Sequence, residues 1–143
     1  LFAYCKRSQE PISALMLEID HFKKINDTFG HAVGDWVLKT VCATVRLQLG
    51  KTDVLGRLGG EEFGICQPSA TEEEVLALAE RCRSAIAEID TEVCGFRFPI
   101  SASFGVATRG HRELQSFEET LAAADKALYF SKNEGRNRVS AYQ

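Results

Sequence analysis

Carboxylate side chains stand at two points where an apolar segment of this chain meets a loop. Glu18 and Asp20 close the apolar run of residues 13–20, and Glu61 and Glu62 directly follow a pair of glycines. If the two loops lie side by side, their oxygens suit a hard cation such as Mg²⁺, which needs only one or two protein carboxylates when phosphates complete its shell. The alternative interpretation is that these acids are solvated residues at strand ends and hairpin tips.

Hydrophobic periodicity predicts the elements that must position these carboxylates. Strands are expected over residues 13–20, 53–58, 62–66, 96–108 and 138–142. Helices are expected over residues 21–29, over residues 34–49, from a Thr71 cap to about residue 90, and from a Ser116 cap to about residue 132. This order predicts an α/β or α+β sandwich in which helices flank a central, mostly antiparallel sheet.

Turn and cap residues sharpen these boundaries. Thr71 and Glu74 have the spacing of a capping box at the start of a helix. Gly50 is expected to end the second helix. Gly59 and Gly60 can supply positive φ at both centres of a tight hairpin turn.

Composition and charge narrow the class of protein. With 143 residues, 45% hydrophobic and 26% charged, the chain has the balance of one globular domain. A formal net charge of -3 gives no general field to attract a polyanion, which argues against nucleic-acid binding. No apolar run approaches the roughly 18 residues of a membrane span, and the first residues lack the pattern of a signal peptide. We expect a soluble, cytoplasmic domain without membrane contact.

Cysteine and histidine usage argues against a zinc site and against a disulfide framework. The five cysteines are an odd number without a C-x-x-C pair. The three histidines include no i, i+4 pair of the kind that binds zinc on a helix. We expect reduced cysteines that mostly pack in the interior.

Four ordered blocks of the sequence carry a resemblance to one family. The first is L-E-I-D-H-F-K-K-I-N-D-T-F-G-H-A-V-G-D at residues 17–35, and the second is R-L-G-G-E-E-F at residues 57–63. S-F-G-V-A at residues 103–107 and the stretch of residues 124–139 follow. Together they resemble the GGDEF domain, the catalytic domain of diguanylate cyclases, over roughly residues 13–140. A lone GGEEF motif would be weak evidence for the family, whereas four ordered blocks at the family's spacing are strong evidence for it.

The resemblance implies a nucleotidyl-cyclase or palm-like fold and an enzyme that condenses two GTP into cyclic di-GMP with release of two pyrophosphates. One site binds one GTP, so the resemblance also implies a homodimer in which two sites face each other. The family's opening block, of the type D-x-L-T-G-L-x-N-R, is absent. We therefore expect residues 1–143 to be a single GGDEF domain from a longer signalling protein.

The resemblance assigns roles to individual residues. It implies that Glu61 and Glu62 are catalytic acids, with Glu62 helping to deprotonate the attacking 3′-hydroxyl. For Mg²⁺ or Mn²⁺ it implies three ligands, namely Glu18, the backbone carbonyl of Ile19, and Glu61. For GTP it implies binding positions at Lys23, Asn26, Asp35, Leu38, Gly59, Gly60, Lys132 and Arg136, together with backbone amides near His21 and Phe22.

Elementary chemistry supports the nucleotide assignments. An ionised Asp35 only accepts hydrogen bonds, which suits guanine's N1–H and exocyclic amino donors and opposes the acceptor at adenine N1. Asn26 can donate to a guanine acceptor, and such a pair can discriminate by about 10⁴-fold or more. Lys132 and Arg136 suit phosphates, because phosphoryl transfer depends largely on positioning and electrostatic stabilisation. The alternatives are a helix-surface Asn26, a helix cap at Asp35 and a solvated basic face.

Two positions depart from the family pattern. Glu18 stands where the family usually has aspartate, and its extra methylene moves the carboxylate by about an ångström, which can cost about 10² in rate. We expect reduced but measurable activity. The primary inhibitory site has Gly50 in place of arginine and retains Asp53, so tight product inhibition there is not expected. Arg81 could still form the family's secondary inhibitory contact.

Two other functions stay open. A catalytically weak or inactive GGDEF domain could bind GTP or cyclic di-GMP as a regulatory module, which Glu18 and the lost arginine favour. An interaction or dimerisation domain without nucleotide conflicts with the intact GGEEF motif, Asn26 and Asp35. Binding without turnover would reveal the first, and failure of GTP to raise the melting temperature in Mg²⁺ would favour the second.

Overall fold

The structure is a computed structural model and describes residues 11–110 and 116–143. Its elements follow in the order β1 (Ile12–Ile19), α2 (Phe22–Phe29), α3 (His31–Arg46), β2 (Val54–Arg57), β3 (Glu62–Pro68), α4 (Glu72–Ala87), the 3₁₀ helix η1 (Thr91–Cys94), β4 (Ala102–Thr108), α5 (Phe117–Asn133) and β5 (Val139–Ala141). The strands form one sheet in the order β2-β3-β1-β4-β5. All neighbours are antiparallel except β4 and β5, so the predicted mostly antiparallel sheet is confirmed.

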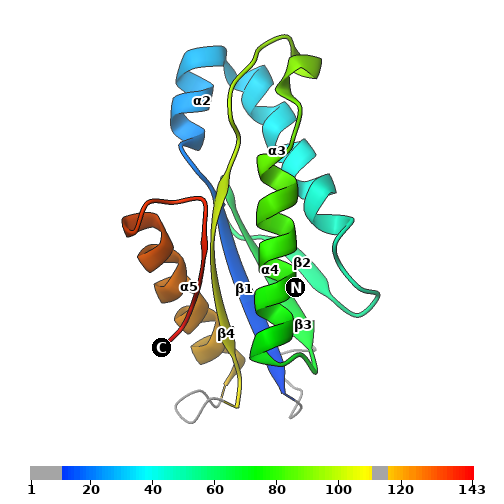
Figure 1. Cartoon of the computed structure of the whole chain (residues 1–143), viewed down its shortest axis with the longest axis vertical. Coiled ribbons are helices and arrows are strands. Elements are labelled where there is room, and N and C mark those ends of the chain that lie inside the picture. The colour runs from blue at the N-terminus through cyan, green and yellow to red at the C-terminus, as the bar shows by residue number, and fades with distance from the viewer. Residues whose placement is uncertain (1–10, 111–115) are drawn as a thin grey trace.

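Alternation along the central strand β1 divides the core between the two faces of the sheet. Leu15 and Leu17 pack in a cluster with α3 and α4. Ala14 and Met16 pack in a second cluster with α5. Figure 1 shows α5 on one side of the sheet and α4 on the other, so the predicted sandwich is confirmed. Glu18 has the parity of Ala14 and Met16 and belongs to the α5 face.

Helix α5 lies very close to strand β4. A methyl group at Gly105 would stand 2.1 Å from the carbonyl oxygen of Ala124 and 2.1 Å from the backbone nitrogen of Leu128. Further along, the Ser131 hydroxyl donates a hydrogen bond to the Phe104 carbonyl at 2.7 Å. These contacts fix the position of α5 along the sheet, and with it the side chains near the C-terminal end of the helix.

Both predicted helix caps are present. The Thr71 hydroxyl accepts from the Glu74 amide, and the Glu74 carboxylate accepts from the Thr71 amide, each at 3.1 Å, which completes the capping box before α4. The Ser116 hydroxyl accepts from the Glu119 amide at 3.1 Å before α5. Within residues 11–110 and 116–143, no helix has both the length and the apolar character needed to cross a membrane.

Three predicted boundaries are wrong. Helix α3 begins at His31, three residues before the predicted start at Gly34. Helix α3 ends at Arg46, and Gly50 instead donates its amide to the Asp53 carboxylate at 2.8 Å in the following turn. Residues 96–101 are not a strand, although their apolar residues suggested one. The Thr91 hydroxyl accepts from the amide of Phe98 at 3.0 Å and donates to its carbonyl at 3.1 Å, which directs these backbone groups to η1 instead of the sheet.

The prediction of reduced cysteines is wrong at one position. Cys66 in β3 is disulfide-bonded, whereas Cys42, Cys82 and Cys94 are free. Cys5 lies outside the described residues. No local pattern marks Cys66, because disulfide formation depends on distances in the folded chain. Burial raises the pKa of the Cys82 thiol to about 11, which suits a packing role.

Candidate active site

The end of β1 brings acidic side chains of two strands together on the α5 face of the sheet. Glu18 stands directly opposite Glu62 of β3 in the antiparallel register. Lys132 of α5 places its Nζ 3.0 Å and 3.1 Å from the two carboxylate oxygens of Glu18. This ion pair is largely shielded from water, with 28% of the Lys132 side chain and 22% of the Glu18 side chain exposed. Three sequence-predicted site residues therefore form one charged cluster.

Burial raises the pKa of the Glu62 carboxyl above its usual value. The negative charges of Asp125, Glu18 and Glu61 raise it as well, while Lys132 lowers it. A carboxylate with a raised pKa is a better proton acceptor near neutral pH. Sequence analysis missed Asp125. Its place two helical turns before Lys132, on the same face of α5, is the signal that could have found it.

The oxygen donors at this end of the sheet suit a hard divalent cation. The Lys132 ammonium already holds a positive charge against both oxygens of Glu18. The Ile19 amide donates to the Glu61 carbonyl at 3.2 Å, which holds the second acidic loop against β1. Among the described residues, no three Asp, Glu, His or Cys side chains converge on one point. The protein would thus supply only part of a coordination shell, as is usual for Mg²⁺ bound with phosphates.

The hairpin between β2 and β3 differs from the predicted tight turn. Neither Gly59 nor Gly60 has a positive φ. A methyl group at Gly60 would meet nothing within 4 Å, and one at Gly59 would meet only the Glu62 Cβ at 3.8 Å. Arg57, which sequence analysis also missed, donates to the carbonyl oxygens of Gly59 at 3.1 Å and Gly60 at 2.7 Å. Within the described fold, neither a positive φ nor a close contact requires glycine at these two positions.

The predicted guanine-binding pair lies on the adjoining helices α2 and α3. A Cβ at Gly34 would stand 1.7 Å from Asn26 Oδ1, so glycine at this position makes room for the Asn26 carboxamide. Asp35 follows on α3 and is exposed, as is Lys23 on α2. Leu38 lines a pocket of about 280 Å³ between α3 and the β2–β3 hairpin. The pocket lining does not include Asn26 or Asp35.

Asp20 is a buried carboxylate that ties three chain segments together. It is 7% exposed and accepts hydrogen bonds from the Ser101 hydroxyl at 2.7 Å, the Ser103 hydroxyl at 2.6 Å and the Asn137 amide at 3.0 Å. The segment held by Asn137 includes Arg136, one of the predicted phosphate-binding residues. Sequence analysis singled out Asp20 as a carboxylate at the strand end and missed its structural role.

Strained backbone conformations occur next to these hydrogen bonds of Asp20. His21, Arg136 and Asn137 have φ angles of 55°, 62° and 46°, and they are three of the four non-glycine residues with positive φ in the described chain. Such conformations cost free energy and tend to gather at functional sites. His21 is the N-cap of α2, and the Arg136 amide donates to the Ser131 carbonyl at 3.0 Å. The backbone is thus held in fixed, costly geometry at predicted phosphate-binding positions.

The predicted inhibitory positions lie elsewhere. Asp53 precedes β2, at the end of that strand away from the hairpin, and its carboxylate is engaged by the Gly50 amide. Arg81 is exposed on α4.

Comparisons with known proteins place this chain in a family. Residues 1–138 match the family model described as diguanylate cyclase, GGDEF domain. The chain is 39% identical over 132 residues to Diguanylate cyclase A of Treponema denticola, which covers 92% of this chain and 35% of that protein. It is 37% identical over 143 residues to Diguanylate cyclase DosC of Escherichia coli, covering 99% of this chain and 30% of that protein. The chain belongs to the GGDEF domain family and spans about a third of the length of these relatives.

Solved structures agree with this placement. The active GGEEF domain of a diguanylate cyclase from Vibrio cholerae superposes with a TM-score of 0.87 at 34% identity, over 99% of this chain and 89% of that one. The GGDEF domain of DgcB from Caulobacter crescentus, solved in complex with c-di-GMP, gives a TM-score of 0.86 at 32% identity, over 98% and 82%. The predicted GGDEF fold is therefore confirmed.

Proposed function

We propose that this domain is a diguanylate cyclase that condenses two GTP into cyclic di-GMP. The observation that carries the proposal is the cluster of Glu18, Glu62 and Lys132 at the end of β1, in a chain of the GGDEF family. Each 3′-hydroxyl attacks the α-phosphorus of the other GTP, the bond to the bridging oxygen of the β-phosphate breaks, and pyrophosphate leaves. Because each site holds one GTP, two domains face each other as a homodimer.

Glu62 accepts the proton of the attacking 3′-hydroxyl in this proposal. Its partly buried position and the neighbouring acids raise the pKa of its carboxyl, which makes the ionised form a stronger base. Lys132 and Arg136 hold phosphates, together with Lys23 and the backbone amides near His21 and Phe22. The start of a helix presents free amides, which suits an anion at the beginning of α2.

A divalent cation, Mg²⁺ or Mn²⁺, completes the site. Glu18, the Ile19 carbonyl and Glu61 would hold it, and when bound it neutralises phosphate charge during the transfer. Gly59 and Gly60 let the hairpin backbone approach the nucleotide.

Guanine is recognised between α2 and α3. Asp35 accepts from the N1–H and amino donors of the base, Asn26 donates to a base acceptor, and Leu38 supplies apolar contact. The space that the missing side chain of Gly34 leaves for the Asn26 carboxamide supports this assignment. GTP is thereby preferred to ATP.

Regulation through the primary inhibitory site is weak in this proposal. Asp53 lacks an arginine partner at Gly50, and its carboxylate already accepts the Gly50 amide. Arg81 is the remaining candidate for a secondary contact with cyclic di-GMP. We place the domain in the cytoplasm, where GTP is available, with no contact to nucleic acid or membrane.

A regulatory module that binds GTP or cyclic di-GMP without turnover is the second candidate. The observation that favours it is the Glu18–Lys132 ion pair, because a side chain one methylene longer than aspartate reaches the lysine with both of its oxygens.

Chromatographic detection of cyclic di-GMP separates the two candidates. The purified chain is incubated at high concentration with GTP and Mg²⁺, beside a Glu61→Ala, Glu62→Ala variant. Product from the parent alone supports the cyclase. If the parent makes no product even when a fused coiled coil forces dimerisation, and GTP still raises its melting temperature, the result supports the regulatory binding module.

A further inference from the structure

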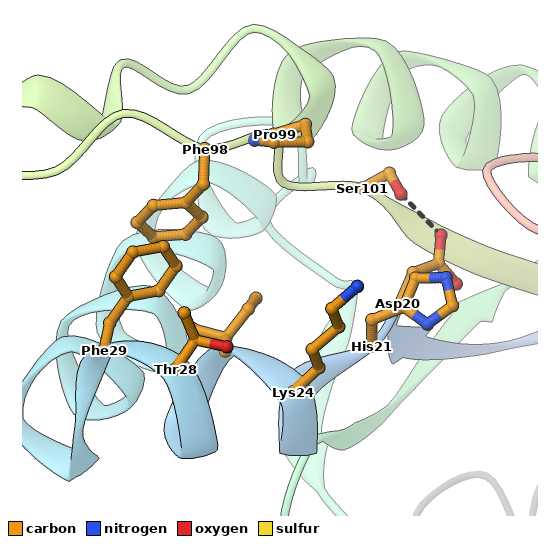
Figure 2. A pocket seen from close by; sticks show the side chains of 9 residues that line it. Asp20, His21, Lys24, Thr28, Phe29, Phe98, Pro99 and Ser101 are labelled. Atoms are coloured by element: carbon orange, nitrogen blue, oxygen red, sulfur yellow. Dashed lines mark hydrogen bonds between the residues drawn. The ribbon is translucent and has the colours of Figure 1, made fainter.

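The Asp20 carboxylate is joined to both chain segments that the proposed function assigns to phosphate. Along the chain, Asp20 directly precedes His21, the N-cap of α2. Figure 2 shows its carboxylate next to His21, with the hydrogen bond from Ser101. The same carboxylate oxygen, Oδ2, accepts from the backbone amide of Asn137 at 3.0 Å, across 117 positions of sequence. Asn137 directly follows Arg136.

The turn that carries Arg136 has an unfavourable backbone conformation. Arg136 and Asn137 are consecutive non-glycine residues with φ angles of 62° and 46°. Such a conformation costs free energy and persists only where the surrounding contacts determine it. The Arg136 amide donates to the Ser131 carbonyl at 3.0 Å, but Ser131 belongs to α5, the helix that the turn continues. Contacts with other parts of the fold are therefore needed to hold the turn in place.

Two side chains from elsewhere in the fold hold Asn137. Arg83 of α4 donates from Nη1 to the Asn137 carboxamide oxygen at 3.0 Å, and this hydrogen bond is exposed to solvent. Asp20 binds the Asn137 amide from the interior, because it is only 7% exposed. The Ser103 hydroxyl donates to Asp20 Oδ1 at 2.6 Å and fixes the direction of the carboxylate. A hydrogen bond shielded from water is the stronger of the two, so the Asp20 contact dominates.

The Arg136 guanidinium has no such support of its own. Among the residues that the structure describes, no acidic side chain forms an ion pair with it. Lys132, the other basic residue assigned to phosphate on this segment, is held by Glu18. The position of the Arg136 guanidinium therefore depends on the backbone of the turn, and its positive charge is not neutralised within the described chain.

We propose that Asp20 is a positioning residue for phosphate binding. Through the Asn137 amide it fixes the turn that carries Arg136, and it thereby sets the Arg136 guanidinium against the triphosphate beside the start of α2. Asp20 itself touches no substrate. The inference rests on the proposed role of Arg136 in binding GTP.

A double-mutant cycle tests whether Asp20 acts through Arg136. The affinity for 3′-deoxy-GTP in Mg²⁺ is measured by isothermal titration on the parent, Asp20→Ala, Arg136→Ala and the double variant. Loss of a charge-assisted contact weakens binding by at least about tenfold, and we expect this loss in each single variant. The double variant is expected to bind within about twofold of Arg136→Ala, because both substitutions remove the same contact.

Ser13→Ala is the matched control for lost stability. Ser13 is buried at the opposite end of β1, and its hydroxyl donates to the Ala70 carbonyl at 3.0 Å. This variant also loses a buried hydrogen bond of the central strand, but far from Arg136 in the fold. Its Kd is expected to stay within about twofold of the parent, since destabilisation of a folded chain does not by itself alter the site.

Parental affinity in Asp20→Ala would overturn the proposal, and so would full additivity of the two losses in the double variant. If Asp20→Ala shows no cooperative thermal transition, Asp20→Asn takes its place in the cycle, with a loss of at least about threefold expected because the acceptor is no longer charged. The analogue cannot react, so the outcome is separate from that of the cyclase assay. A parent that binds the analogue but makes no cyclic di-GMP would refute the cyclase alone, whereas a parent that does not bind it would refute both proposals.

Discussion

Substitution of Gly34 by alanine is expected to weaken nucleotide binding while leaving the stability of the fold nearly unchanged. The new Cβ would stand 1.7 Å from Asn26 Oδ1 and 2.8 Å from its Cγ. Only this side chain has to move, and a changed rotamer costs about 0.5–1.5 kcal/mol. Alanine gains about 1 kcal/mol over glycine inside a helix, so the two effects nearly cancel. We expect a melting temperature within about 4 °C of the parent.

Nucleotide affinity responds differently, because the displaced carboxamide no longer reaches the base. One lost hydrogen bond in a desolvated site costs about 1–3 kcal/mol, or roughly 5- to 150-fold in Kd. The assay is titration with 3′-deoxy-GTP in Mg²⁺, which lacks the nucleophile and is not turned over. Gly60→Ala, whose methyl group meets nothing within 4 Å, is the control for melting temperature. Parental affinity in Gly34→Ala would refute the assignment of Asn26, and a fall in melting temperature beyond about 10 °C would show that the helix backbone yields instead.

Three further predictions concern stability. Gly105→Ala forces a methyl group against α5 backbone atoms at 2.1 Å, so we expect a loss of about 3 kcal/mol and a melting temperature lower by about 10 °C in thermal circular dichroism; a loss below 2 °C would contradict the close packing. Asp20→Asn turns an amide donor toward groups that already donate, and it should cost about 2 kcal/mol by urea unfolding, whereas Asp27→Asn at an exposed position costs almost nothing. The raised pKa of Glu62 means that the folded state favours its protonated form, so the associated stability is present at low pH and is lost as pH rises through the folded pKa. Glu62→Gln should therefore melt higher than the parent at pH 8 and show a smaller difference at pH 4; the opposite trend would contradict the burial of this carboxyl.

Local patterns predicted those parts of the fold that depend on local physics. The apolar run of residues 13–20 predicted a strand, and the structure has β1 there, from Ile12 to Ile19. Thr71 and Ser116 cap their helices as expected, because a cap involves residues only three positions apart. The strand prediction for residues 96–101 failed for the opposite reason, because the conformation of this segment depends on hydrogen bonds to the Thr91 hydroxyl, which hydrophobic periodicity does not record.

The candidate site depends on contacts between residues far apart in the sequence, which local patterns cannot predict. Lys132 meets Glu18 across 114 positions of sequence, and Asn137 meets Asp20 across 117. The motif resemblance named Lys132 as a site residue, but neither motif nor periodicity indicated that it would pair with Glu18. Asp125 and Arg57 were missed because their roles follow from what they face in the fold, namely Glu62 and the hairpin carbonyls.

The ion pair of Glu18 and Lys132 has a consequence for the order in which the proposed site is loaded. The carboxylate that would hold the metal is already neutralised by an internal cation. A bare divalent ion held by Glu18 would have to displace Lys132 and leave that ammonium without a partner in a partly dry environment, which is unfavourable. If metal and triphosphate arrived together, Glu18 would be available to hold the metal and Lys132 would be available to hold a phosphate. Loading would then be an exchange of partners between two ion pairs, and the proposed site would favour the metal–nucleotide complex over either component alone.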